Sequence, residues 1–286
     1  MNFWNDLSWV EPLRNPYLTP IFENITLLGY PLFLVLFISF GYFFWSPARF
    51  TRVAMLLFIS GIINSFLKDY FQDPRPAIEF MLDPKVGTSY GLPSGHAQIA
   101  VTLWGLLAYE LKNKWVTVSS LILIALICFS RLYLGVHDMG DIISGLAIGI
   151  TILLLWDLAI NQKIYEKFNS ITWLCVILLF QLITYLSYPF HEGHEPSVWS
   201  FGVMTGWYLG SSNIHLNLKT IKKLFISIVS ITMVFFTMIY ITQLEAANNL
   251  TGITGLLISY SLGLLFAFIV TWLIPRLWKF FNLASQ

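Results

Sequence analysis

The chain alternates long apolar runs with short polar breaks along most of its length. A run of roughly 18 or more apolar residues is long enough to cross a bilayer as a helix. The pattern therefore predicts an all-α fold, a polytopic transmembrane helical bundle of about nine spans. The predicted spans are 22–46, 51–71, 94–111, 115–134, 138–160, 171–188, 197–213, 221–242 and 252–274.

The first 20 residues depart from this pattern. Trp4 and Trp9 alternate there with Pro12, Pro16 and Pro20. Prolines break helices, and tryptophan is enriched at the level of the lipid headgroups. We predict an interfacial segment over 1–20.

Composition agrees with a membrane protein. The 286 residues are 57% hydrophobic and only 11% charged, whereas charged residues make up about a quarter of a soluble domain. The net charge of +1 and the absence of a basic tract argue against a nucleic-acid partner. Cys128 and Cys175 both fall within predicted spans, so we interpret them as reduced packing residues.

Basic residues mark alternate loops, and this distribution predicts the orientation. Loops 189–196 and 243–251 carry no Lys or Arg. Basic loops stay in the cytoplasm, so the N-terminus is predicted outside and the C-terminus inside. The residues that mark the cytoplasmic side are Arg49, Arg52, Lys112, Lys114, Lys163, Lys167, Lys219, Lys222, Lys223, Arg276 and Lys279.

Loop 72–93 lies on the predicted outer side but contains Arg75 and Lys85. Basic residues that oppose the orientation rule usually serve another purpose. Pro74 and Pro76 flank Arg75, end the preceding helix and hold the arginine on a stiff turn.

The stretch Pro93-Ser94-Gly95-His96 follows on the same side. Ser94 is predicted to cap a helix that begins at His96 and continues to Leu111. The first amides of that helix, with Gly95 unshielded, form an anion site. His96 in that position can exchange a proton with a bound anion.

A third polar stretch links the fourth and fifth predicted spans. His137 and Asp141 are four residues apart, which would place them on one face of a helix. A carboxylate in that position fixes one imidazole tautomer, so the other ring nitrogen is left as a nucleophile. Gly145 and Gly149 continue the same spacing and predict a closely packed neighbouring helix.

Lys68, Arg75 and Arg131 supply positive charge on this predicted face. Such charge stabilises the oxygens of a transferring phosphoryl group, and guanidinium forks suit phosphate. Taken alone, Lys68 and Arg131 also fit helix-end anchors that reach the headgroups. The ordered combination of all three stretches favours a phosphate site.

At these residues the chain resembles the type-2 phosphatidic acid phosphatase superfamily of membrane lipid phosphatases. The family pattern is Lys, six residues, Arg-Pro; then Pro-Ser-Gly-His; then Ser-Arg, five residues, His, three residues, Asp. The chain matches it from Lys68 to Asp141. Further cues, such as Leu13-Arg14-Asn15-Pro16-Tyr17-Leu18, resemble the sphingosine-1-phosphate phosphatase-like branch.

The resemblance implies a metal-independent enzyme without a cofactor that acts through a phosphohistidine. It assigns His137 as nucleophile, Asp141 as its partner and His96 as general acid and base. It assigns phosphate binding to Lys68, Arg75, Ser94, Gly95 and Arg131. It also implies a six-helix phosphatase core over 21–190, with additional C-terminal helices over 191–286.

The expected partners are a phosphorylated lipid and the bilayer, with a homodimer left open. The expected place is a bacterial inner membrane with the site facing outward, or a lumen-facing site in the endoplasmic reticulum. A lipid phosphotransferase and a non-enzymatic lipid translocator are the alternatives. The lipid stays open among phosphatidic acid, phosphatidylglycerol phosphate, undecaprenyl pyrophosphate, lipid A phosphate and a sphingoid phosphate.

Two further patterns lie toward the C-terminus. His191-Glu192-Gly193-His194-Glu195 contains metal-ligand residue types but lacks the zinc-protease helix pattern, so we interpret it as a pH-sensitive or substrate-facing loop. Gly202, Gly206 and Gly210 repeat at a spacing of four, which predicts helix packing or dimerisation.

Overall fold

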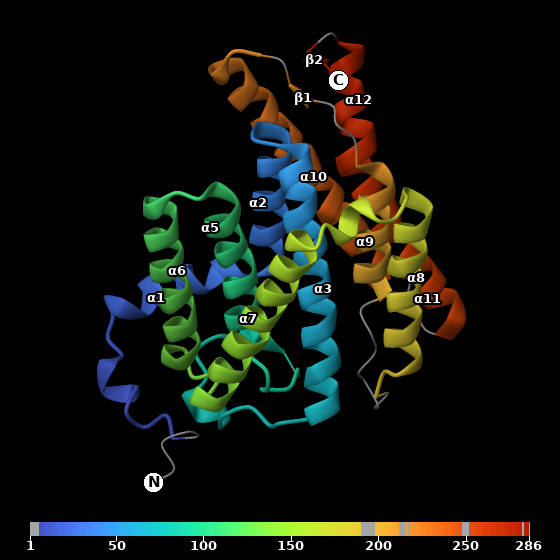
Figure 1. The fold of residues 1–286 in the computed structure, drawn as a ribbon. Coiled ribbons are helices and arrows are strands. Elements are labelled where there is room, and N and C mark those ends of the chain that lie inside the picture. Colours follow the sequence, from blue (N-terminus) through green and yellow to red (C-terminus); the bar gives the residue numbers. More distant parts are fainter. Residues whose placement is uncertain are drawn as a thin grey trace. The chain divides into compact units, whose positions relative to one another are not determined.

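The computed structural model is almost entirely helical (Figure 1). It describes residues 6–87, 89–189, 198–211, 215–216, 218–247, 252–281 and 283–285. The α-helices are α1 (Leu18–Thr26), α2 (Pro31–Phe44), α3 (Pro47–Phe71), α4 (Gly95–Ala100), α5 (Leu106–Leu111), α6 (Lys114–Tyr133), α7 (Met139–Asn161), α8 (Ser170–Leu186), α9 (Val198–Gly210), α10 (Thr220–Ala247), α11 (Gly252–Phe268) and α12 (Ile274–Phe280).

Short elements connect or extend these helices. The 3₁₀ turns are η1 (Glu11–Leu13), η2 (Leu27–Gly29), η3 (Ile78–Phe80), η4 (Pro84–Val86) and η6 (Ile164–Glu166). The π-helical segments η5 (Val101–Gly105) and η7 (Ile269–Leu273) join α4 to α5 and α11 to α12. The strands β1 (His215–Leu216) and β2 (Ala284–Ser285) form one antiparallel pair, with His215 opposite Ser285.

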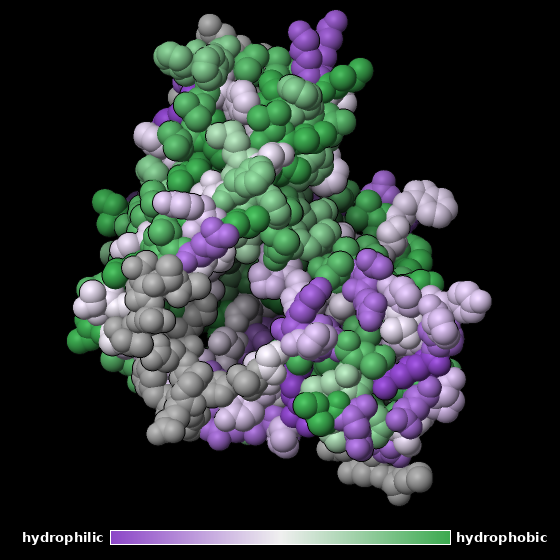
Figure 2. Space-filling model, turned by 180° about the vertical axis from the view of Figure 1, so that it is seen from behind, coloured by the Kyte–Doolittle hydropathy of each residue, from purple (hydrophilic) through white to green (hydrophobic). Residues whose placement is uncertain are grey.

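Five described helices are long and apolar enough to cross a membrane, and a sixth span arises if α1 and α2 count as one bent pair. The 59° bend of that pair falls where Pro31 begins α2. Apolar side chains cover much of the surface in Figure 2, and Leu121 and Leu154 are 62% and 60% exposed. The protein is therefore an integral membrane protein, while the span count of nine stays a prediction.

The chain forms two compact units, each assembled from separate segments. One comprises Met1–Phe33, Ile59–Asn169 and Thr184–Pro196, and the other comprises Leu34–Phe58, Ser170–Ile183 and Ser197–Gln286. The division into 1–20, 21–190 and 191–286 stays a prediction. The loop His191–Glu195 lies outside the described residues.

The first unit brings α1, α4, α6 and α7 together. Its core includes Leu7 and Val10 from the N-terminal segment, packed with Leu132, Tyr133 and Val136. Arg14 donates to the Tyr133 carbonyl over 3.1 Å and to the Phe80 carbonyl over 2.7 Å. The segment before α1 therefore supports the chain beside the link from α6 to α7.

The C-terminal glycine repeat lies in the second unit, where its glycines let α9 pack closely against α11. A Cβ added at Gly202 would lie 2.0 Å from the Tyr260 carbonyl oxygen of α11, and one at Gly206 would lie 2.3 Å from that of Leu264. The predicted helix packing is confirmed, and dimerisation stays a prediction. Cys128 is buried, but Cys175 is exposed, so the interpretation of Cys175 as a packing residue is wrong.

Candidate active site

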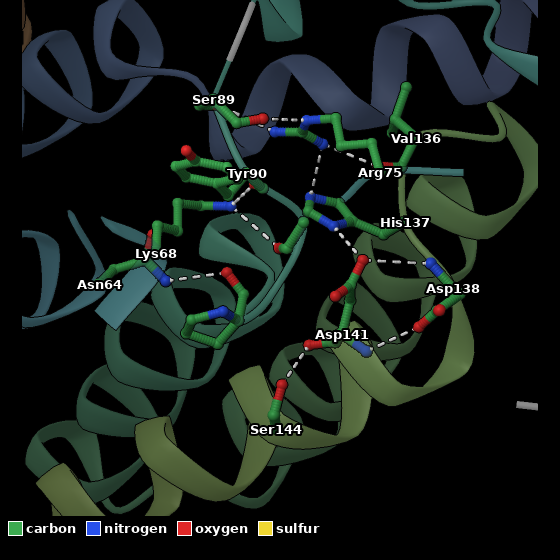
Figure 3. Close-up of polar contacts among 12 residues, drawn as sticks. Asn64, Lys68, Arg75, Ser89, Tyr90, Val136, His137, Asp138, Asp141 and Ser144 are labelled. Atoms are coloured by element: carbon green, nitrogen blue, oxygen red, sulfur yellow. Dashed lines mark hydrogen bonds and ion pairs between the residues drawn. The ribbon is translucent and has the colours of Figure 1, made fainter. Parts of the chain in front are cut away.

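The three polar stretches converge in the first unit (Figure 3). Lys68 lies in the last turn of α3, and Arg75 follows on the proline-flanked turn. The Pro93–His96 turn opens α4, and His137 precedes α7. The predicted site residues therefore come from connections between helices and from the helix ends beside them.

His137 and Asp141 form a buried pair. Nδ1 of His137 lies 2.8 Å from Oδ2 of Asp141, and the side chains are 2% and 1% exposed. The predicted contact is confirmed, but the local structure behind it is different. His137 lies outside α7, which begins at Met139, so the two residues do not share a helix face.

A capping box brings the carboxylate back to His137. The Asp138 side chain accepts from the Asp141 amide over 3.0 Å, and Oδ2 of Asp141 accepts from the Asp138 amide over 3.2 Å. Because the first amides of a helix lack backbone partners, a carboxylate at the third position turns toward the helix start. The start of α7 thus fixes the orientation of Asp141.

Arg75 defines the tautomer of His137. Its Nη1 lies 3.3 Å from Nε2 of His137, and a guanidinium can only donate. Nε2 therefore accepts, and Nδ1 carries the hydrogen toward Asp141. Burial, and then the charges of Lys68 and Arg75, hold the pKa of His137 well below its usual range. The ring is neutral at pH 7 and has a lone pair on Nε2.

Arg75 and Lys68 also bind the chain just before α4. Arg75 donates to the Ser89 carbonyl over 2.6 Å, to Ser89 Oγ over 2.8 Å and to the Val136 carbonyl over 2.7 Å. Lys68 donates to the Tyr90 carbonyl, and over 2.9 Å to the Gly91 carbonyl. Burial lowers the pKa of Arg75 to about 10, so the guanidinium keeps its charge at neutral pH.

The turn at Ser94 differs from the prediction. The helix begins at Gly95, one residue before the predicted start at His96. The Ser94 side chain makes no capping hydrogen bond. The Ser94 amide instead donates to the Asp141 carbonyl over 2.9 Å. Oγ of Ser94 is buried without a partner among the described residues.

A buried amide pair supports the same turn. Nδ2 of Asn64 donates to the Pro93 carbonyl over 3.2 Å and to Oε1 of Gln98 over 2.9 Å. A Cβ at Gly95 would lie 2.9 Å from Oδ1 of Asn64, so glycine permits this approach. Sequence reasoning missed Asn64 and Gln98, because neither carries a motif that marks it.

Glycines let α7 approach the turn from the other side, as predicted. A Cβ at Gly145 would lie 2.5 Å from the Ser94 carbonyl oxygen, and one at Gly149 would lie 2.9 Å from that of Gln98. Any larger residue would push the Pro93–His96 turn away from Asp141. The distance between the Pro93–His96 turn and Asp141 thus depends on close contact between the backbones of α4 and α7.

His96 lies against the bend between α1 and α2. Its Nε2 is 3.2 Å from the Thr26 carbonyl oxygen, so this nitrogen carries a hydrogen. The Tyr30 ring meets the imidazole edge-on, with 4.7 Å between centroids. A Cβ at Gly29 would lie 2.2 Å from Cδ2 of His96, which leaves no room for a larger residue there.

Arg131 is buried near the end of α6. It donates from Nη1 to Oγ1 of Thr26 and, over 2.9 Å, to Oδ2 of Asp83. Its charge helps to lower the pKa of His137. Sequence reasoning missed the two partners, and the only signal for Asp83 was the Asp-Pro step that opens a helical turn.

The polar atoms available for a ligand suit an oxyanion. Oγ of Ser94, Nε of Arg131 and Oδ1 of Asp141 are buried, and none of the three has a partner among the described residues. Ser94 and Arg131 can donate hydrogen bonds, as phosphate oxygens require. The described part of the chain has no group of three His, Cys, Asp or Glu side chains that could hold a metal ion.

A neutral buried histidine among three cations, at the ends of apolar helices, is an arrangement suited to covalent phosphoryl transfer. Residues 49–165 match the PAP2 superfamily. The chain thus carries a PAP2 superfamily domain over these residues.

Named relatives agree with this assignment. The chain is 31% identical to lipid phosphate phosphatase delta of Arabidopsis thaliana, over 70% of this chain and 52% of that protein. It is 28% identical to phosphatidylglycerophosphatase B of Bacillus subtilis (strain 168), over 50% and 75%. It is 24% identical to sphingosine-1-phosphate phosphatase 2 of Mus musculus, over 65% and 54%. The chain spans about half the length of the first and third of these relatives.

Gly29 tests how His96 is held. We expect Gly29→Ala to displace the imidazole and to lower kcat/KM for phosphate release by about a hundredfold, because a shift of about 1 Å in a catalytic group can cost that much. Gly61→Ala is the matched control, since its Cβ would meet nothing within 4 Å. Equal activity of the two variants would show that the position of His96 does not matter.

Proposed function

We propose that this protein is a lipid phosphate phosphatase that hydrolyses a phosphate monoester or pyrophosphate through a phosphohistidine. The observation that carries the proposal is the buried His137–Asp141 pair, whose Nε2 accepts from Arg75. The relatives named for lipid phosphates, phosphatidylglycerophosphate and sphingosine-1-phosphate support a lipid substrate.

In the first step, the Nε2 lone pair of His137 attacks phosphorus, and the bond from phosphorus to the lipid oxygen breaks. The 3.3 Å contact from Arg75 is long for a hydrogen bond, so the phosphoryl group can displace it. The imidazole becomes positively charged, and Asp141 at 2.8 Å stabilises that charge. Asp141 therefore serves as the orienting partner of the nucleophile.

His96 is proposed to exchange the proton. Because Nε2 of His96 donates to the Thr26 carbonyl, Nδ1 is the nitrogen that transfers the proton. For the first step Nδ1 takes up a proton when the phosphate anion is bound, so that the ring is an imidazolium, and it then gives this proton to the leaving lipid oxygen. In the second step it takes a proton from the water that attacks phosphorus, which releases inorganic phosphate and restores His137.

The charge on the transferring group would be stabilised without a metal ion. Lys68, Arg75 and Arg131 supply three cations, and the Ser94 hydroxyl and the Gly95 amide supply neutral donors. In this structure Lys68 and Arg75 donate to carbonyl oxygens of the loop at 89–91. A phosphate would share or replace those carbonyl acceptors.

The proposal is tested by phosphate release from purified protein over a panel of the five lipid classes named above, assayed in EDTA. We expect His137→Ala to abolish release and Asp141→Asn to retain part of it, because the nucleophile survives in the second variant. Thr151→Ala, an exposed position on α7, is the control.

Near-normal turnover by His137→Ala would rule out covalent catalysis at this residue. Loss of activity in EDTA that added divalent ions restore would rule out the metal-independent mechanism. Formation of a phosphorylated lipid or sugar acceptor, with no release of inorganic phosphate, would favour a phosphotransferase.

The site is further proposed to face away from the cytoplasm, because the predicted cytoplasmic loops carry Lys and Arg. In a background with Cys128→Ala and Cys175→Ala, we expect Glu79→Cys to react with an impermeant thiol reagent in intact cells. Asn113→Cys should react only after lysis. Both positions are exposed, so the reverse pattern would overturn the orientation.

A further inference from the structure

Arg131 is a buried cation that links three separate elements through its two partners. It is 1% exposed, and its carboxylate partner Asp83 is 6% exposed. Asp83 precedes η4, Arg131 ends α6 and Thr26 ends α1. A buried charge requires such partners, because loss of one of them leaves the other charge uncompensated.

Both hydrogen bonds of Arg131 to described residues come from one nitrogen, Nη1. Nη1 carries two hydrogens, and it donates to both Thr26 and Asp83. Nε of Arg131 is buried without a partner among the described residues. A guanidinium is planar and its five donors have fixed directions, so an anchor at Nη1 determines where Nε points.

Asp83 is itself held in place. Its Oδ1 accepts from the Lys85 amide over 3.2 Å, and its Oδ2 accepts from the Tyr30 hydroxyl over 2.5 Å as well as from Arg131. Burial raises the pKa of Asp83, but the hydrogen bonds from Tyr30 and Arg131 outweigh burial and lower it below its usual range. The carboxylate is thus charged at neutral pH.

Tyr30 links this carboxylate to the rest of the site. The ring that meets His96 edge-on also lies 5.8 Å from the Arg131 guanidinium carbon. The Thr26 backbone likewise accepts from His96 while its side chain accepts from Arg131. One short stretch of chain, 26–30, therefore contacts both residues.

We propose that Asp83 is a positioning residue for phosphate binding. With Thr26 it anchors Nη1 of Arg131, so that Nε stays directed to the phosphoryl oxygens. This inference rests on the proposed phosphatase function. Asp83 acts through Arg131 and does not touch the substrate.

If Asp83 instead competed with phosphate for Arg131, a different experimental result would be expected. A carboxylate that occupied the phosphate position would compete with the substrate, and its removal would tighten anion binding. A positioning residue gives weaker anion binding when it is removed. The inhibition constant for orthovanadate, a phosphate analogue, therefore separates the two roles.

We expect Asp83→Ala to raise the inhibition constant for orthovanadate and to lower kcat/KM, each by about tenfold to a hundredfold, as for a lost hydrogen bond to a charged group. Asp83→Asn should raise the inhibition constant less, by about threefold or more, because an amide oxygen is a weaker acceptor than a carboxylate. Glu79→Ala removes a charge from an exposed position of the same loop and should change neither quantity.

A double-mutant cycle separates this role from simple destabilisation. In an Arg131→Lys background, Asp83→Ala should cost less than about threefold in kcat/KM, because the guanidinium that it positions is gone. Additive losses would overturn the inference. So would an unchanged or lower inhibition constant in Asp83→Ala or, if that variant does not fold, in Asp83→Asn. Absence of phosphate release from the unmodified protein would instead refute the proposed function.

Discussion

The hydrogen bond from Nδ1 of His137 to Asp141 is the contact on which the rest of the site depends. It fixes a hydrogen on one ring nitrogen and leaves the other as an acceptor. Burial and the surrounding cations keep the ring neutral, and without the carboxylate they would disfavour the positive charge that the proposed attack by Nε2 would create. The pair would therefore reconcile the proposed cationic phosphate site with a proposed nucleophile that becomes cationic.

The fold holds this pair by the start of one helix and by close backbone contact. The capping box at Asp138 sets the direction of Asp141, and the Asp141 carbonyl accepts from the Ser94 amide. Gly145 lets α7 lie against the Ser94 carbonyl. The geometry of the proposed site follows from backbone positions, which are more rigid than long side chains.

Much of this arrangement could be predicted from the sequence. Apolar runs indicated membrane helices, and the spacing of the three polar stretches indicated one shared site. The spacing of His137 and Asp141 indicated their contact, although the helical reason for it was wrong, because a capping box gives the same spacing. Ser94 was expected to cap α4, but its hydroxyl makes no capping hydrogen bond and is buried without a partner among the described residues.

The supporting residues could not be found in this way. Asp83, Thr26 and Asn64 act through tertiary contacts, and the pairing of Asp83 with Arg131 joins residues 48 positions apart. Nothing in the local pattern around Thr26 distinguishes it from other threonines in apolar helices. Such contacts depend on how the bend after α1 is placed beside α6, which hydrophobic periodicity does not encode.

The most direct test of the account is the chemical position of the phosphate in the trapped intermediate. Purified protein would be mixed with a labelled lipid phosphate that it hydrolyses, quenched in alkali within one turnover, and mapped by mass spectrometry with standards for the two phosphohistidine isomers. The account predicts phosphate on Nε2 of His137, because Asp141 blocks Nδ1. Phosphate on Nδ1, on His96 or on Ser94 would contradict it.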